Sequence, residues 1–317
     1  MVVFGPIPSR RLGHSLGVNH IPPKHCSYAC VYCQVGPTPE PEIERRAFLP
    51  VDDVVAEVTA RVRQLRERGD GLDFLTFVPD GEPTLDLNLA EIIGRLRPLG
   101  VPIAVITNAT LLGRADVRAA LTLADWVSVK VDAAREAEWR RVNRPHPDLR
   151  LDEVLDGTLA FARAFTGCLA TETMLVGGVN DDEDAIEAVV AHVAALQPET
   201  AYVAIPTRPT AERGAEPPAE AVVARVYQQF ASRLRRVELL AGFEGTGFGT
   251  SGDAERDLLS ITAVHAMRED TVAALLERDG ADWSVVDDLI ARGELVAVPY
   301  RGHRFYMRRF TRPPGDR

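Results

Sequence analysis

Residues 24–36 read KHCSYACVYCQVG, and they hold three of the four cysteines in this chain of 317 residues. Cys26, Cys30 and Cys33 have the spacing C-x3-C-x2-C, which is close enough for the three thiols to hold one object. Cys168 lies far from them in an apolar stretch. Tetrahedral metal sites and cubane iron–sulfur clusters each have four positions to fill. The sequence therefore raises the question of what occupies the fourth position.

Apolar stretches alternate with amphipathic ones from the cysteines to about residue 236. Short apolar runs predict buried strands at 16–21, 72–78, 101–107, 125–131, 168–176 and 201–206. Helical periodicity predicts helices at 51–68, 87–97, 114–123, 151–165, 182–196 and 219–235. Alternating strands and helices favour a parallel sheet covered by helices. The expected fold class is therefore α/β, a partial (β/α)6 barrel of the TIM type with its site at the carboxyl ends of the strands.

A glycine-rich stretch at 243–253 interrupts this pattern. Three short helical stretches follow it, and after them two strand-like pieces meet at a turn formed by Arg301 and Gly302. Three helices followed by a hairpin are typical of a small winged-helix module. We therefore expect a barrel domain at 1–250 and a winged-helix domain at 251–317.

The bulk composition is that of a globular protein, with 46% hydrophobic and 26% charged residues. No apolar run reaches the roughly 20 residues that a membrane span needs, and the first residues do not resemble a secretory signal. Four cysteines, three of them clustered, favour a reducing cytoplasm over a disulfide scaffold. The net charge of −10 argues against non-specific coating of nucleic acid, although a local basic patch is compatible with it.

The cysteine spacing, with an aromatic residue (Tyr32) before the last cysteine, resembles the motif of the radical S-adenosylmethionine (SAM) superfamily. The resemblance implies that Cys26, Cys30 and Cys33 bind three irons of a [4Fe–4S] cluster. It implies that SAM chelates the fourth iron, which answers the question of the fourth position. It also implies a low-potential electron donor of the flavodoxin or ferredoxin type, and reductive cleavage of SAM to a radical that removes a hydrogen atom from the substrate.

A second element supports this resemblance. PDGEPT at 79–84 follows a predicted strand, as the Gly-Glu-Pro element does in the superfamily. By resemblance, Glu82 accepts the SAM ammonium and Gly81 allows a close approach of the backbone. Further cofactor contacts are expected at Tyr32, Thr107, Asn108, Ser128, Lys130 and Ile205.

Four residues are expected on the substrate side of the site. Asp132 shares a strand face with Ser128 and Lys130, and Asn143, Arg144 and Arg208 lie in loops. Arginine binds phosphate or carboxylate through two parallel hydrogen bonds, so these loops can hold an anionic substrate. Loop packing and surface solvation are the alternative for these residues.

Several residues have a structural alternative. Lys130 is charged in an otherwise buried strand, where either a salt bridge or a cofactor contact would stabilise it. Cys168 is expected to be a small buried hydrophobe, with hydrogen-atom donation as the alternative. Residues 9–11 are expected to seal the edge of the sheet rather than to reach the site. Zinc with His20 or His25 as fourth ligand is the alternative to the cluster, but it would not account for the Gly-Glu-Pro element.

Three stretches extend the resemblance to one subfamily. The segments at 4–22, 142–147 and 206–212 are similar to the radical SAM subfamily grouped with the wyosine-base synthases of tRNA. The synthase that makes the tricyclic base uses a second cluster, and this chain has no cysteines left for one. A tRNA base is therefore one expected substrate, and a protein or a small molecule is the alternative.

The last stretch, 301–317, holds six arginines interleaved with Phe305, Tyr306 and Phe310. This composition is typical of a wing that contacts nucleic acid, tRNA included, while protein contact or capping of the barrel is the alternative.

A rival hypothesis from another class of protein is an iron–sulfur sensor of redox state or iron with a nucleic-acid-binding winged helix. A sensor has no need of the Gly-Glu-Pro element, so the sequence favours the enzyme.

Overall fold

A computed structural model describes residues 2–241 and 248–309 of the chain. Eight strands form one sheet whose order follows the sequence. The first two strands pair antiparallel, and all later neighbours pair parallel. The strands are β1 (Val3–Ser9), β2 (Gly13–Val18), β3 (Phe74–Phe77), β4 (Ile103–Thr107), β5 (Trp126–Lys130), β6 (Cys168–Met174), β7 (Thr200–Ala204) and β8 (Val237–Leu240).

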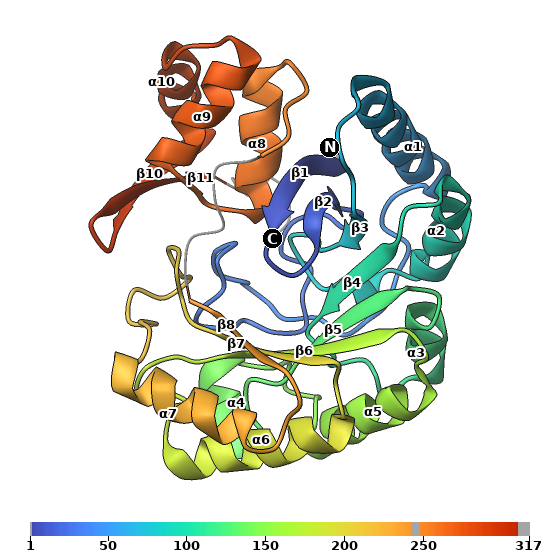
Figure 1. Cartoon of the computed structure of the whole chain (residues 1–317), viewed down its shortest axis with the longest axis vertical. Coiled ribbons are helices and arrows are strands. Elements are labelled where there is room, and N and C mark those ends of the chain that lie inside the picture. Colours follow the sequence, from blue (N-terminus) through green and yellow to red (C-terminus); the bar gives the residue numbers. More distant parts are fainter. Residues whose placement is uncertain (1, 242–247, 310–317) are drawn as a thin grey trace.

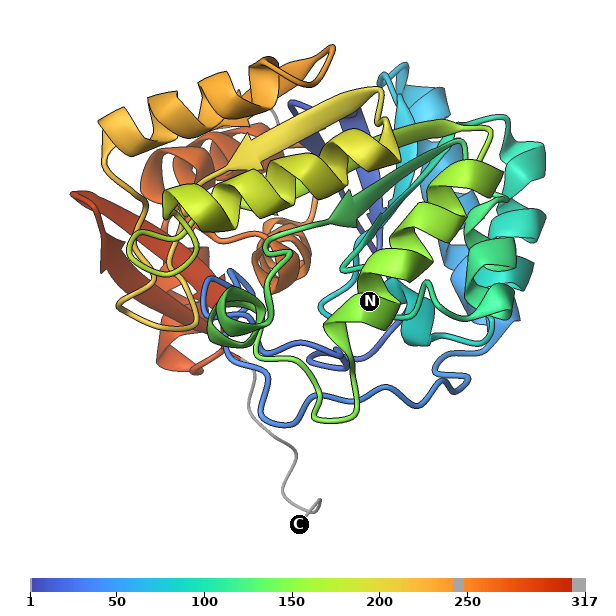
Figure 2. The same ribbon diagram turned by 90° about the horizontal axis from the view of Figure 1, so that it is seen from below.

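The sheet curls into an open half-barrel, and the helices cover its outer face (Figures 1 and 2). These helices are α1 (Val51–Arg68), α2 (Leu89–Leu96), α3 (Ala115–Leu121), α5 (Leu151–Ala164), α6 (Glu183–Leu196) and α7 (Glu220–Ala231), with 3-10 turns at Pro83–Leu85 and Arg97–Leu99. The short helix α4 (Glu136–Val142) packs instead against residues 28–32. The expected α/β class and partial barrel are confirmed. No helix in the described parts of the chain is long and apolar enough to cross a membrane.

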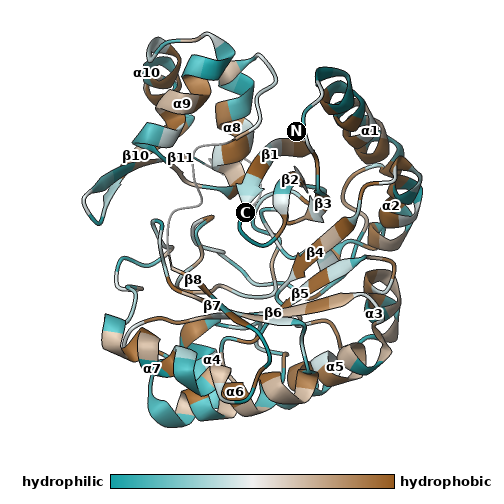
Figure 3. Cartoon of the chain, in the orientation of Figure 1, coloured by the Kyte–Doolittle hydropathy of each residue, from teal (hydrophilic) through white to brown (hydrophobic). Residues whose placement is uncertain are grey.

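Each helix packs on the sheet through one apolar face, as α1 illustrates. Val54, Val58, Val62 and Leu65 recur at helical spacing and are all buried against the strands. Burial of each such side chain contributes roughly 1.5–3 kcal/mol. The helix ends where Gly69 adopts a φ of 75°, a conformation that glycine reaches without strain. Figure 3 shows this division of apolar and polar faces around the sheet.

The inner face of the sheet changes character along the strands. At the amino ends of the strands, an apolar floor closes the barrel interior, formed by Leu12, Ala104, Trp126, Ala170 and Tyr202. Towards the carboxyl ends, the same face carries polar side chains, because alternate residues of a strand share one side. An apolar floor beneath polar walls places the site at the carboxyl ends, as in other parallel βα folds.

Three features were not predicted from the sequence. Strand β1 pairs with β2, which begins at Gly13 rather than at 16. Strand β8 has only four residues, one of them Glu238, and this stretch is too short to give a clear apolar run. Helix α4 has seven residues, too few to establish a helical period.

The C-terminal part consists of α8 (Ala254–Val264), β9 (Met267–Arg268), α9 (Glu269–Asp279), α10 (Ser284–Ala291), β10 (Leu295–Tyr300) and β11 (His303–Arg308). Its three strands form a separate antiparallel sheet in the order β10-β11-β9. It has its own apolar core, against which Ile7 of β1 packs. Arg61 and Arg68 of α1 donate to the carbonyl of Thr250, which ties the connecting segment to the barrel.

The C-terminal part therefore lies beside β1 at the open side of the half-barrel (Figure 1). The expectations for 243–247 in the glycine-rich stretch, and for Phe310 and the arginines at 312 and 317, fall outside the described residues.

Candidate functional site

The loop that carries the cysteines is held against the carboxyl end of β3 by its backbone. The amide of Lys24 donates to the carbonyl of Asp80 at 2.9 Å, and the amide of Glu82 donates to the carbonyl of His25 at 2.8 Å. A Cβ atom on Gly81 would lie 2.0 Å from the His25 carbonyl oxygen, far inside contact distance. His25 directly precedes Cys26. The absence of a side chain at Gly81 therefore allows the cysteine loop to approach the segment after β3.

All three cysteines of the loop line one cavity of about 350 Å³. Two of them accept hydrogen bonds from asparagine side chains. Asn108 Nδ2 lies 3.5 Å from Cys26 Sγ, and Asn143 Nδ2 lies 3.4 Å from Cys30 Sγ. None of the three cysteines is in a disulfide, so each thiol can act as a metal ligand.

The surroundings of these thiols fit a cationic iron cluster. Burial raises the pKa of Cys26 well above its usual value, and burial together with Asp132 raises the pKa of Cys30 to about 12. Thiolates are the metal-binding form, so at neutral pH these side chains need positive charge beside them, which iron supplies. In the described ranges, no three His, Cys, Asp or Glu side chains gather as a site for a single metal ion requires. A cube instead spreads its thiolate ligands over separate irons.

Glu82 lies beside the cysteines on the cavity wall, with its carboxylate fixed by four donors. Oε1 accepts from Thr84 N, Thr84 Oγ1 and Thr107 Oγ1, and Oε2 accepts from Asn108 N at 2.7 Å. Burial raises the pKa of Glu82, and these donors oppose the effect. Among the described residues, Oε2 accepts one hydrogen bond and keeps room for a second, so the carboxylate can receive a cation without moving.

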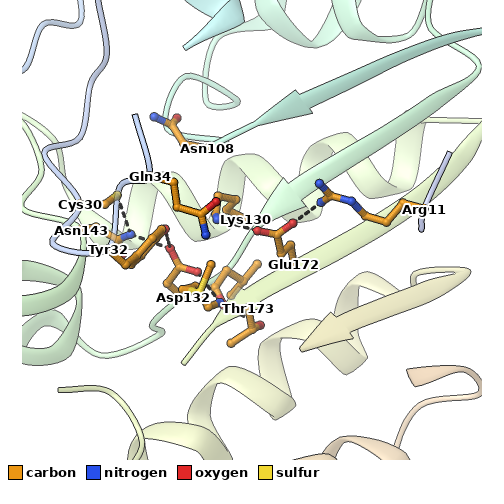
Figure 4. A network of polar contacts seen from close by, with 12 residues as sticks. Arg11, Cys30, Tyr32, Gln34, Asn108, Lys130, Asp132, Asn143, Glu172 and Thr173 are labelled. Carbon is orange, nitrogen blue, oxygen red and sulfur yellow. Dashed lines mark hydrogen bonds and ion pairs between the residues drawn. The ribbon is translucent and has the colours of Figure 1, made fainter. Parts of the chain in front are cut away.

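Asp132 and Asn143 support the cysteine loop from beneath, and the structure does not place either side chain on the wall of the main cavity. Asn143 Nδ2, which donates to Cys30 Sγ, also donates to Asp132 Oδ2 at 2.7 Å. Asp132 in turn accepts from Tyr32 Oη and from Met174 N. Figure 4 shows this chain of contacts, which fixes the side chain that reaches Cys30.

A chain of three charges lies on the inner wall beside this network, and Lys130 Nζ stands 4.8 Å from the centroid of the Tyr32 ring. Lys130 Nζ lies 2.7 Å from Glu172 Oε1, and Arg11 pairs with the other carboxylate oxygen (Figure 4). Burial alone would raise the pKa of Glu172, but Lys130 and Arg11 outweigh it and lower the pKa to about 2. All three residues line the cavity, so Lys130 makes a salt bridge and also faces the expected cofactor space.

The remaining expected site residues divide into two groups. Thr107, Ile205 and Arg208 line the cavity, and Arg208 Nη1 donates to Gln34 Oε1 at 2.8 Å. Ser128 is fully buried in the sheet, and its Oγ has no hydrogen-bond partner among the described residues.

Arg144 lies outside the main cavity. Its side chain is half exposed and forms an ion pair with Glu212 on the protein surface. Its backbone has a φ of 46°, in the left-handed region, which sets the direction of the loop after Asn143.

The structure corrects the expectation for residues 9–11. Ser9, Arg10 and Arg11 line the cavity rather than sealing the edge of the sheet, because the turn between β1 and β2 reaches into the amino-terminal end of the barrel interior. Two cavity residues were not predicted from the sequence. Glu172 stands in an apolar run, and His265 follows α8 and reaches the same cavity from the C-terminal part. The sequence did hold a signal for Glu172, because a charged residue within an apolar strand points to a polar contact on one face of the sheet.

Cys168 begins β6, at the end of the strand away from the cysteine loop. It packs against the apolar floor of the barrel. Burial and Glu199 raise its pKa to about 12. Cys168 thus packs on hydrophobic side chains, but it is only partly buried rather than buried as expected.

The fold and this arrangement of cysteines match a known family. The sequence model of the Radical SAM superfamily matches residues 21–189, which include the cysteine loop, the Gly-Glu-Pro element and β3 to β6. The chain therefore belongs to the radical SAM superfamily. It is an enzyme of that superfamily, whose cofactors are a [4Fe–4S] cluster and SAM, and such enzymes generally require a reductant such as flavodoxin or ferredoxin.

Among individual proteins, the UPF0026 protein MJ1312 of Methanocaldococcus jannaschii is 42% identical over 309 residues, which are 97% of this chain and 96% of that protein. Two solved structures are similar in fold. A radical SAM methyltransferase from Sphaerobacter thermophilus has a TM-score of 0.51 and 19% identity, over 72% of this chain and 66% of its own. TYW1 with a lysine–pyruvate adduct bound has a TM-score of 0.54 and 15% identity, over 71% of this chain and 76% of its own.

Proposed function

We propose that Cys26, Cys30 and Cys33 hold the [4Fe–4S] cluster, that Glu82 receives the ammonium of SAM, and that the enzyme abstracts a hydrogen atom from a substrate in the cavity. When bound and reduced, the cluster with SAM supplies a 5′-deoxyadenosyl radical. One observation carries the proposal. The three cysteines and the fixed carboxylate of Glu82 line the same cavity, at the carboxyl ends of the strands.

The chain's own residues position and shield these groups. Asn108 joins the two halves of the site, because its amide N donates to Glu82 and its side chain donates to Cys26. The charge chain through Lys130 can orient a carboxylate or a hydroxyl of the cofactor, while Ile205 offers an apolar edge. The apolar floor excludes water from below, so the polar groups act at low dielectric.

The C-terminal part is proposed to be a winged-helix domain at 251–317, with the barrel domain at 1–250. Its three helices and its antiparallel sheet of a hairpin and one further strand support this assignment. Its own apolar core supports a domain boundary in the connecting segment.

For the substrate we propose a tRNA base, supported by the subfamily resemblance and by the arginines of the last hairpin. The similarity to the solved structure of TYW1 supports only a common fold. A protein or a small molecule as substrate remains the alternative within the enzyme class. Tight binding of tRNA that weakens steeply with salt favours the tRNA base.

The direct test is anaerobic. The protein is reconstituted with iron and sulfide, SAM and dithionite are added, and 5′-deoxyadenosine is quantified. Wild type and Cys168→Ala are expected to form it, and Cys33→Ala is expected not to. A wild type that binds iron but neither binds nor cleaves SAM would contradict the proposal and favour a sensor.

A further inference from the structure

A second cavity, of about 510 Å³, lies between the barrel and the C-terminal part. The loop after β7 and helix α7 form one side of it, through residues such as Pro217 and Val223. The other side belongs to the C-terminal part, through Arg268 of β9, Arg301 of the hairpin turn and His303 of β11. Its size falls within the range of about 300–1,000 Å³ that is usual for ligand sites.

The two cavities meet at a shared wall. Ile205, Thr207, Arg208 and His265 line both of them, and we call these four residues the neck. The catalytic cavity, at about 350 Å³, lies near the lower end of the range for a single ligand. SAM bound against Glu82 would take most of that space. A substrate must therefore extend beyond the catalytic cavity, and the second cavity lies on the other side of the neck.

The second cavity is rich in cationic side chains. Arg208, Arg268 and Arg301 contribute guanidinium groups, and Glu220 is the one carboxylate among its lining residues in the described chain. Arg268 donates to Asp270 through both Nε and Nη2, and Arg208 donates to Gln34, while Arg301 is exposed at the tip of the hairpin. Guanidinium groups match phosphate oxygens through parallel hydrogen bonds, and several in one cavity suit a ligand with more than one negative charge.

We propose that the second cavity binds the phosphate-bearing part of the substrate, which passes its reacting carbon through the neck towards the cofactor. This inference rests on the proposed function and adds to it a subsite for the phosphate of the substrate and the route of its reacting carbon. The C-terminal part then completes the substrate site, since it supplies His265 to the neck and Arg268 and Arg301 to the phosphate subsite. A free nucleotide and an RNA strand share this chemistry.

The test measures binding to the reconstituted, SAM-bound protein. A short fluorescein-labelled RNA is titrated and its anisotropy followed over a range of salt concentrations. Arg301→Gln and Arg268→Gln are each expected to weaken binding several-fold and to lower the salt slope by about one. Arg292→Gln is the matched control, because Arg292 lies in the same part of the chain, pairs with Glu255 and is absent from the cavity wall.

Competition identifies the source of the phosphate. Displacement of the RNA by a nucleoside monophosphate supports a free nucleotide, and displacement by unlabelled RNA alone supports a strand. Equal displacement by a polyglutamate peptide, no binding of either phosphate compound, or equal affinities of Arg301→Gln and Arg292→Gln would overturn the inference. SAM cleavage by the wild type alone is measured in parallel. Cleavage without phosphate binding would refute the second cavity and leave the proposed function standing.

Discussion

Replacement of Glu172 by glutamine tests the buried charge chain on the cavity wall. The folded-state pKa of Glu172 is about 2, against 4.5 for the free side chain. At about 1.4 kcal/mol for each tenfold change in proton affinity, the ionised carboxylate contributes roughly 3 kcal/mol to the free energy of unfolding. Loss of one partner from a buried ion pair costs a similar amount, because Lys130 and Arg11 would remain buried and cationic.

The assay is urea denaturation under anaerobic conditions, followed by circular dichroism, for wild type and Glu172→Gln. Because the folded pKa lies below the unfolded one, the stabilisation is complete above about pH 5 and is lost as the pH falls towards 2. The difference between the two proteins should be about 3 kcal/mol at pH 7 and should narrow to roughly 2 kcal/mol at pH 3.5.

A surface pair of similar geometry is the control. Arg95 Nη1 and Asp52 Oδ1 lie 2.6 Å apart, but the Asp52 side chain is 84% exposed. Asp52→Asn should therefore leave the urea midpoint unchanged within error. A loss below about 1 kcal/mol for Glu172→Gln at pH 7, or an equal loss in both variants, would refute the argument that burial makes this ion pair matter.

Three further outcomes follow from the site. Gly81→Ala should push the cysteine loop away and lower the iron and sulfide bound per chain, whereas Gly94→Ala, whose Cβ would meet nothing within 4 Å, should retain both. Asn143→Leu removes the N–H donor to Cys30, so the midpoint potential of the cluster should become more negative. Redox titration followed by electron paramagnetic resonance measures this potential, and an unchanged value would contradict the expectation. Cys30→Ala should abolish the cluster and Cys168→Ala should preserve it, and equal iron loss in both would refute the ligand assignment.

Much of the fold was predictable because its signals are local. The apolar face of α1 and the run that forms β5 each lie within one segment, and the helix was predicted with its observed bounds, 51–68. Strand β8 and helix α4 escaped because they are short, and tertiary packing rather than local pattern determines them.

The site was predictable as far as motifs reach. The cysteine loop and Glu82 could be proposed from the sequence because their spacing and neighbouring residues mark them. Asp132 was placed with the substrate because it shares a strand face with Ser128 and Lys130, and Asn143 because it lies in a loop beside Arg144. Their hydrogen bonds instead turn both side chains towards the cysteine loop. Sequence order does not show which side chain lies beneath another. For the same reason the partnership of Arg11 with Glu172, 161 residues apart, could not be foreseen.

The open seam of the half-barrel has a consequence for how this enzyme can diversify. Strands β1 to β8 do not close a ring, and a part with its own apolar core stands at the gap. That part contributes Val264 and His265 to the catalytic cavity and none of the residues beneath the cysteines. On the proposed function, radical generation belongs to the barrel alone, whereas the proposed substrate subsite takes residues from both the barrel and the C-terminal part. Exchange of the C-terminal part is therefore expected to change which substrate is selected while the barrel keeps the cysteine loop and Glu82.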